Sequence, residues 1–168
     1  VKSFKNAYKS QDSILIPISC DNNKHPVDNK LSLLYVQLLN GEEFILPFDH
    51  SETLNIDIPN LESDTRKYTY DRKRLNNFIK LDNVIDVNLM HYMGTNLPLS
   101  VETIDTNAHN FFNMRYYKKE NINTIIPVLK HLEYCRELVK VVKDTITKYN
   151  EYVNVSYNNE ILDNLTYI

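Results

Sequence analysis

Two apolar runs flank an Asn-Gly pair in Leu31-Ser-Leu-Leu-Tyr-Val-Gln-Leu-Leu39-Asn40-Gly41-Glu42-Glu43-Phe-Ile-Leu-Pro-Phe48. Runs of apolar and aromatic residues of this length are typical of buried β-strands. An Asn-Gly pair between them favours a tight type I′ turn, because that turn needs positive φ at both of its central residues. The stretch therefore predicts a β-hairpin with strands at Leu31–Leu39 and Glu43–Phe48.

The same reasoning predicts further elements on both sides of the hairpin. Ser13–Ile18 and Asn83–Val87 are short apolar runs suited to buried strands. Apolar residues at helical spacing predict a long helix over Ile125–Tyr149, with Pro127 in its first turn. Shorter helices are expected from near Asp71, from Leu89 to Met93 and from Thr106 to Tyr116. This succession predicts an α/β domain with a mixed sheet.

The composition is that of one soluble globular domain. The chain has 168 residues, of which 42% are hydrophobic and 24% charged, enough for a single core. It has no apolar run of membrane-spanning length and no signal peptide, so we expect an intracellular protein with no membrane partner. Its two cysteines, Cys20 and Cys135, are expected to be reduced thiols. Abundant Asn, Ile, Lys and Tyr indicate an AT-rich genome, for example a viral one.

Several blocks of sequence have a fairly specific order and spacing. The second hairpin run ends in Leu46-Pro-Phe-Asp-His50, and Tyr70-Asp-Arg-Lys-Arg-Leu75 follows. Next come Val84-Ile-Asp-Val-Asn-Leu-Met-His-Tyr92, Ile104-Asp-Thr-Asn-Ala108 and the long helix. Together these blocks resemble the proofreading 3′–5′ exonuclease domain of family A DNA polymerases, over roughly residues 12 to 168.

The resemblance implies an RNase H-like exonuclease fold, in which helices flank a mixed central sheet that contains an antiparallel hairpin. It assigns residues 1–150 to an exonuclease-like domain. Residues 151–168 then resemble the start of the polymerase domain, so the chain is expected to be a piece of a longer polypeptide. The implied partners are DNA and the polymerase domain of the same parent chain.

The resemblance also places the metal ligands of the nuclease, and most of them are missing. The family uses four carboxylates to hold two divalent metal ions, since Mg²⁺ and Mn²⁺ need oxygen ligands. Three of these positions fall at Pro17, Ser19 and Cys135, and only Asp71 keeps a carboxylate. His131 stands where the family has a tyrosine that orients the attacking water. We therefore expect a degenerate, inactive exonuclease that binds no cofactor and serves replication as a scaffold and DNA guide.

Two other functions stay open. The first is an active 3′–5′ exonuclease with a remodelled site, in which Asp71 acts with Asp21, Asp86 or Glu133 and Mg²⁺ or Mn²⁺ is required. The second is a protein-interaction module on the same fold, which binds its partner through the old cleft or a sheet edge.

The candidate residues also have structural interpretations. Asp71 at a helix start is a good N-cap. His131 and Cys135 lie four residues apart, so they share one helical face that packs against the sheet or, together with Cys20, ligates zinc. Pro17 is unusual in a strand because it has no N–H, which predicts that the first strand is broken or bulged there.

A basic segment is the candidate nucleic-acid interface. Arg66, Lys67, Arg72 and Arg74 can bind phosphates, and Tyr70 can stack on a base. The net charge of −3 gives no strong electrostatic footprint for nucleic acid. We therefore expect weak binding of single-stranded or primer-template DNA.

Overall fold

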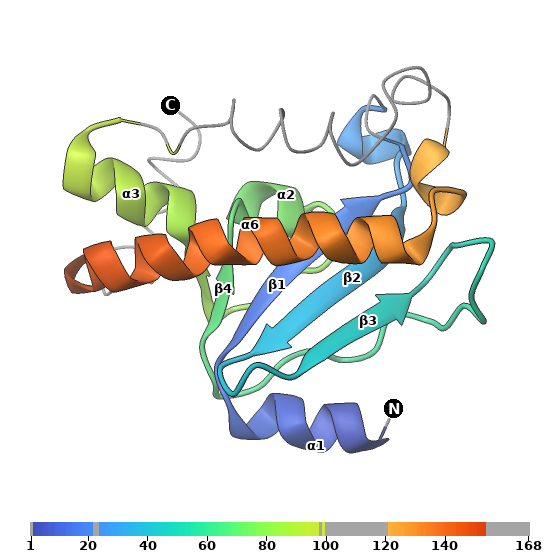
Figure 1. Ribbon diagram of the computed structural model, residues 1–168, viewed down its shortest axis with the longest axis horizontal. Helices are drawn as coiled ribbons and strands as arrows, with labels where there is room; N and C mark the ends of the chain where they lie inside the picture. The colour runs from blue at the N-terminus through green and yellow to red at the C-terminus, as the bar shows by residue number, and fades with distance from the viewer. Residues whose placement is uncertain (1, 22–23, 98, 100–120, 154–168) are drawn as a thin grey trace.

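The computed structural model describes residues 2–21, 24–97, 99 and 121–153. Its centre is a five-stranded sheet with the strand order β3-β2-β1-β4-β5. β1 is antiparallel to β2 and parallel to β4, β2 is antiparallel to β3, and β4 is parallel to β5. Helices flank this sheet, and α6 lies across it in Figure 1. The predicted α/β class with a mixed sheet is confirmed.

The elements follow the sequence closely, with two additions. The strands are β1 (Ser13–Ser19), β2 (Leu31–Leu38), β3 (Glu43–Pro47), β4 (Lys67–Thr69) and β5 (Val84–Asp86). The helices are α1 (Lys2–Ser10), α2 (Arg72–Asn76), α3 (Val87–Thr95) and α6 (Val128–Tyr149), with short 3-10 turns η1 (Pro26–Asp28), η2 (Ile122–Thr124) and η3 (Asn150–Tyr152). Sequence reasoning missed α1 and β4. The expected Thr106–Tyr116 helix and residues 154–168 lie outside the described residues.

The hairpin between β2 and β3 is confirmed, but its predicted turn type is wrong. Gly41 N–H donates to Leu38 O (2.9 Å), and Leu38 N–H donates to Glu42 O (2.9 Å). Gly41 has a φ of 93°, whereas Asn40 does not have a positive φ. Leu39 and Asn40 are thus the central residues of the turn, and Gly41 follows them in the left-handed region. This is the pattern of a three-residue loop with a glycine bulge.

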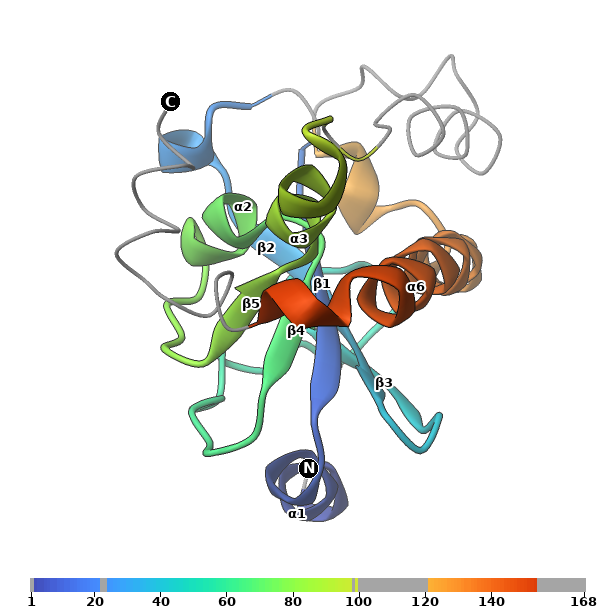
Figure 2. The ribbon, with the colours of Figure 1, turned by 90° about the vertical axis from the view of Figure 1, so that its left-hand side faces the viewer.

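The two faces of the sheet carry separate cores. Alternate side chains of a strand point to opposite faces. On one face the strands pack against α6 and α3 in a core formed by Ile14, Ile16, Ile18, Leu33, Tyr35, Tyr68, Ile85, Val87, Met90, Cys135, Leu138, Val139, Val142 and Val153. On the other face Leu15, Leu34 and Val36 pack with Phe4 and Tyr8 of α1 and with Leu75 of α2. Figure 2 shows α1 at the end of the molecule opposite α2 and α3.

α2 starts where the sequence predicts, whereas α3 begins two residues before the expected Leu89 and α6 three residues after the expected Ile125. Asp71 is the N-cap of α2 and Asp86 is the N-cap of α3. α6 begins directly after Pro127, whose fixed φ suits the first turn of a helix. No helix in the described part of the chain is long and apolar enough to cross a membrane.

Pro17 lies inside β1 without removing a hydrogen bond from the sheet. The N–H groups of a strand alternate between its two neighbours. Ser13 N–H donates to Arg66 O on the β4 side (3.0 Å), so the nitrogen of Pro17, four residues on, faces the same side. β4 pairs with β1 only at Ser13 and Ile14, and Pro17 lies beyond that pairing. The expected irregularity follows immediately, because the register with β2 shifts between Ile18 and Ser19.

Candidate functional site

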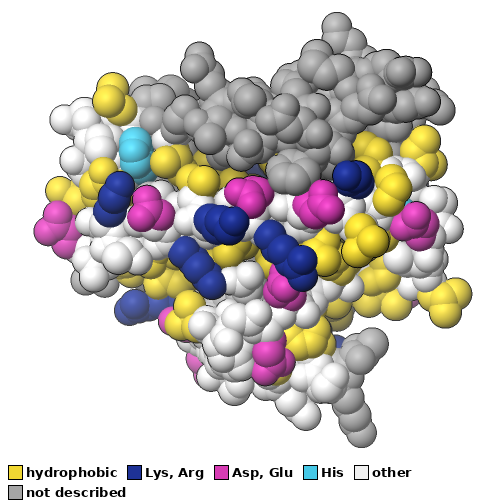
Figure 3. All heavy atoms as spheres, in the orientation of Figure 1, with side chains coloured by type: hydrophobic (Ala, Val, Ile, Leu, Met, Phe, Trp, Pro, Cys, Tyr) yellow, Lys and Arg dark blue, Asp and Glu magenta, His cyan; other side chains and the backbone are white. Residues whose placement is uncertain are grey.

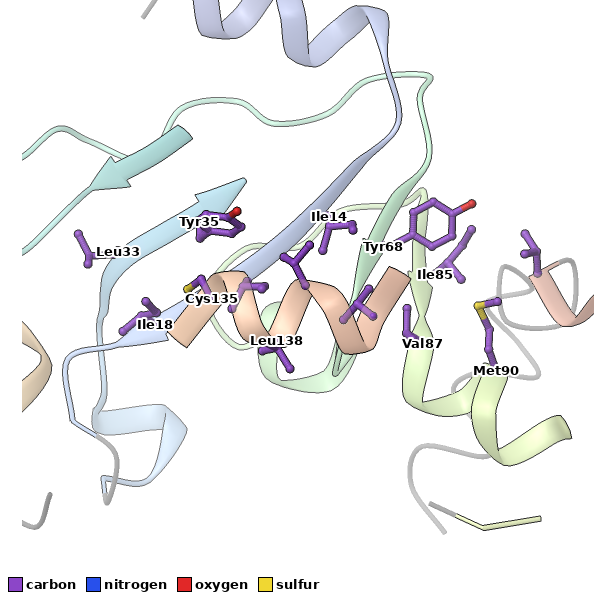
Figure 4. Packing of buried hydrophobic residues seen from close by; sticks show 14 residues of the cluster. Ile14, Ile18, Leu33, Tyr35, Tyr68, Ile85, Val87, Met90, Cys135 and Leu138 are labelled. Atoms are coloured by element: carbon purple, nitrogen blue, oxygen red, sulfur yellow. The ribbon is translucent and has the colours of Figure 1, made fainter. Parts of the chain in front are cut away.

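Cys135 marks the face of the sheet where the nuclease resemblance places its metal site. The side chain is fully buried and belongs to the core between α6 and the sheet. Figure 4 shows it beside Ile18 and Tyr35, and the β1 side chains on this face are Ile14, Ile16 and Ile18. Burial raises the pKa of Cys135, so its thiol stays protonated. An apolar surface and a neutral thiol supply no ligand for Mg²⁺.

Pro17 and Ser19, the two other degenerate ligand positions, do not face Cys135. They alternate along β1 with Ile16 and Ile18, so they point to the opposite face of the sheet. Ser19 is buried, and its hydroxyl donates to Asp21 O (3.1 Å). The structure therefore does not bring Pro17, Ser19 and Cys135 together. The β1 positions that oppose Cys135 are Ile16 and Ile18.

Asp71 has a structural role. Its side chain accepts the N–H of Arg74 (3.3 Å) and caps α2, which confirms the structural interpretation. A carboxylate in this place compensates the unpaired N–H groups of the first helical turn. Capping accounts for the aspartate without a metal ion.

Asp86, the last residue of the edge strand β5, is a buried carboxylate. Sequence reasoning named it only as an alternative metal ligand. It is 5% exposed; its Oδ1 accepts the N–H of Leu89 (2.9 Å) and its Oδ2 that of Arg72 (3.1 Å). One carboxylate thus caps α3 and also holds the first residue of α2. Burial raises the pKa of Asp86 to about 6, and the charge of Asp71 adds to this while the backbone hydrogen bonds oppose it.

The other candidate carboxylates lie apart. Asp21 follows β1 and its Oδ2 accepts the N–H of Asn121 (3.1 Å). Glu133 lies on the outer face of α6, where it pairs with Lys130 at 3.6 Å. Within residues 2–21, 24–97, 99 and 121–153, no three His, Cys, Asp or Glu side chains are placed to hold a metal ion together. The zinc alternative with Cys20, His131 and Cys135 therefore finds no support there.

His131 is buried beneath α6 and does not face an open cleft. Its exposed fraction is 0%, and its Nε2 lies 3.1 Å from Asn123 O. Burial lowers the pKa of His131 to about 4, so the imidazole is neutral near pH 7. The hydrogen bond to the Asn123 carbonyl raises the pKa of His131, but this effect is smaller than the lowering that results from the loss of hydration. A histidine in this place does not orient a water for attack on DNA.

His50 is a buried histidine that sequence reasoning did not single out as a site residue. It follows β3, is 2% exposed and lies edge to face with His131, with 6.0 Å between the ring centroids. Its Nε2 bonds Ile126 O (2.7 Å), and its Nδ1 accepts the N–H of Glu52 (3.1 Å). The contact between the two rings joins residues that are 81 positions apart in the sequence, and no local sequence pattern predicts it.

The basic segment is not one surface. Lys67 is fully buried; its Nζ donates to Ser63 O (2.6 Å) and lies 6.0 Å from the ring centroid of Tyr8. The prediction that Lys67 binds DNA is therefore wrong, because its ammonium group has no access to a phosphate. Arg72 is 8% exposed, which also argues against phosphate contact. Sequence alone places Arg72 near a helix start, but it does not indicate that Arg72 and Lys67 are buried.

The remaining members of the segment are separated. Arg66 and Arg74 are exposed, but they lie at opposite ends of β4. Three strand residues span about 10 Å, so one phosphate does not contact both. Tyr70 is partly buried against the core beneath α6. Only Arg74 and its neighbour Lys73 remain exposed together at the carboxyl end of β4.

The outer face of α6 carries charges of both signs. Figure 3 shows basic and acidic side chains alternating over this helix. They form ion pairs between Lys140 and Glu137 (2.9 Å) and between Lys148 and Asp144 (3.4 Å). Arg136 extends to Glu43 of β3 and holds both carboxylate oxygens with its Nε at 3.2 and 2.9 Å. Along the described length of α6, these pairs leave no continuous positive surface for nucleic acid.

Comparison of the chain with models of protein families, with curated proteins and with solved structures finds no match.

Proposed function

We propose that this chain is a degenerate, inactive 3′–5′ exonuclease-like module of a family A DNA polymerase, with an RNase H-like fold. The proposal rests on the ordered sequence blocks and on a sheet in which β1 is central, β2 and β3 form the hairpin, and β4 and β5 run parallel to β1. Residues 1–150 form the module, and residues 151–168 begin a polymerase-type segment. The module is a scaffold for the polymerase domain.

One observation carries the inactive assignment. The space between α6 and β1, into which the expected ligand position Cys135 points, is filled by Ile16, Ile18 and Cys135 itself. Two dications repel each other strongly, and only clustered negative charge makes their pairing favourable. Apolar side chains provide no such charge, and a core packed in this way leaves no room for a nucleotide.

The module guides DNA weakly, in this proposal, through exposed Lys73 and Arg74. Both belong to α2, beside the carboxyl end of β4. The net charge of −3 opposes binding elsewhere on the surface. A contact of one or two phosphates supplies little affinity and a shallow salt dependence.

The test is an exonuclease assay on the full chain. Labelled single-stranded DNA should remain intact over hours with Mg²⁺ or Mn²⁺. The matched variant is Asp71→Asn, which keeps an N-capping oxygen while removing the charge that a metal would need. DNA degradation by the unmodified chain that is lost in Asp71→Asn would overturn the proposal.

A remodelled nuclease is the second candidate, and one observation favours it. Asp71 follows β4 and Asp86 ends the adjacent parallel strand β5, and the charge of Asp71 contributes to the raised pKa of Asp86. Raised carboxyl pKa values recur at catalytic sites. This candidate requires Mn²⁺ binding in calorimetry that is lost in both Asp71→Asn and Asp86→Asn. Absence of binding heat in the unmodified chain removes it.

A further inference from the structure

Two buried imidazoles meet beneath the first turns of α6. His50 comes from the loop after β3 and His131 from α6 itself, and their ring planes make an angle of 84° at a centroid separation of 6.0 Å. Both side chains are almost completely excluded from solvent. Neither histidine belongs to the proposed DNA-guiding surface. Both make hydrogen bonds with the backbone in addition to their packing contacts.

Each imidazole fastens a different part of the chain. Since Nδ1 of His50 accepts the N–H of Glu52, its Nε2 carries the proton and donates to Ile126 O (2.7 Å). Nε2 of His131 bonds Asn123 O (3.1 Å). The segment from η2 to the start of α6 is therefore tied to the β3 loop by one histidine and to α6 by the other.

The ionisable neighbours make hydrogen bonds of their own, and Glu52 offsets only part of the cost of placing a proton on His131. Glu52 caps α6, where its Oε2 accepts the N–H of Val128 (2.9 Å), and Asp21 accepts the N–H of Asn121. The Cys20 thiol lies 3.7 Å from Asp49 Oδ2, and its burial raises the pKa of that thiol to about 12. Cys135, one helical turn beyond His131, is also a protonated thiol.

A proton has a defined structural cost at this place. On His131 it would create a buried imidazolium 6.0 Å from a second imidazole. Burial already lowers the pKa of His131 to about 4, and His50 contributes to that shift while Glu52 opposes it.

We propose that His131, packed edge to face against His50, is an acid-operated latch, whose protonation releases residues 121–127 and the first turns of α6 while the rest of the domain stays folded. The release is local because the second half of α6 is held elsewhere. Leu138, Val139 and Val142 pack in the core shared with α3, and Tyr149 contacts His91 of α3 edge to face at 5.4 Å. Opening uncovers Ile18, Leu33 and Cys135.

Hydrogen exchange of the full chain, followed by mass spectrometry from pH 7 to pH 4.5, tests the latch. Opening takes up one proton at His131 between the unfolded and folded pKa values. The protection factors of residues 128–135 should therefore fall about tenfold per pH unit below about pH 6.5. Protection of β1 and of residues 139–149 should not change. An equal fall in both halves of α6 would show global acid unfolding and would overturn the proposal.

Two variants separate the latch from ordinary acid sensitivity. His131→Gln stays neutral at every pH and its amide can donate to Asn123 O, so the pH dependence should disappear. His25→Gln, at an exposed position, is the matched control and should keep it. If the protection factors of residues 128–135 fall as steeply with pH in His131→Gln as in the unmodified chain, the proposal is contradicted. If that variant does not fold, an NMR titration of the unmodified imidazoles decides, because release before His131 gains its proton also contradicts the latch.

Discussion

The ring of Tyr149, in the last turn of α6, lies against the backbone of α3 at Gly94. A Cβ placed on Gly94 would come within 2.6 Å of Cε1 of Tyr149, far inside van der Waals contact. The same ring meets His91 edge to face, with 5.4 Å between centroids. The two helices approach this closely because Gly94 has no side chain.

Gly94→Ala should destabilise the domain. An exposed helix-interior glycine normally gains about 0.5–1 kcal/mol on change to alanine. Here the clash with Tyr149 should reverse the sign and cost about 1–3 kcal/mol, as overpacking does. Urea unfolding measures the difference. Repeating the change in a Tyr149→Ala background should restore the ordinary gain, and a gain in the unmodified background would contradict the close packing.

Asp71 should matter for stability through its cap. Asp71→Ala removes the acceptor of the Arg74 N–H and should lower the free energy of unfolding by about 1 kcal/mol. Asp71→Asn keeps an acceptor and should change it by only a few tenths of a kcal/mol. Chemical denaturation of both variants provides the check. Equal losses in the two would indicate that the charge of Asp71, rather than its capping oxygen, stabilises the fold.

The pKa of Asp86 predicts how stability changes with pH. Its folded value of about 6 exceeds the ordinary 3.8, so the folded state binds the proton more tightly than the unfolded state. The stabilising effect of that proton is present below pH 3.8 and is lost as pH rises through 6. Relative to Asp86→Asn, the unmodified protein should therefore gain up to about 1.4 kcal/mol per pH unit as pH falls from 6 to 4. Unfolding midpoints that change in parallel in both proteins would contradict this.

DNA binding should depend on Arg74 and not on Lys67. Arg74→Ala should weaken binding of a single-stranded oligonucleotide and reduce the slope of log affinity against log salt by about one. Lys67→Met replaces a buried ammonium by an apolar side chain of similar length and should leave the affinity unchanged. Fluorescence anisotropy at several salt concentrations measures both. An equal loss in Lys67→Met would contradict the burial of that residue.

Much of the fold could be predicted because its signals are local. The hairpin follows from two apolar runs around a turn, and α6 follows from the 3.6-residue spacing of its buried side chains. The start of α2 follows from Asp71, which satisfies a free N–H group, whereas the capping of α3 by Asp86 was not foreseen. β4 was missed because it has three residues and includes a lysine, whose ammonium group finds its partner in Ser63 O only after folding.

The candidate site was less predictable, because a one-residue change of register moves every strand side chain to the other face. The sequence by itself determined that carboxylates are absent at most of the expected ligand positions and that Asp71 begins a helix. Only the tertiary structure decided that Ile16 and Ile18, not Pro17 and Ser19, face Cys135. It also decided that His50 meets His131 and that Asp86 holds two helix starts. Local patterns specify local hydrogen bonds and periodicity, whereas burial and pairing arise from packing between segments far apart in the chain.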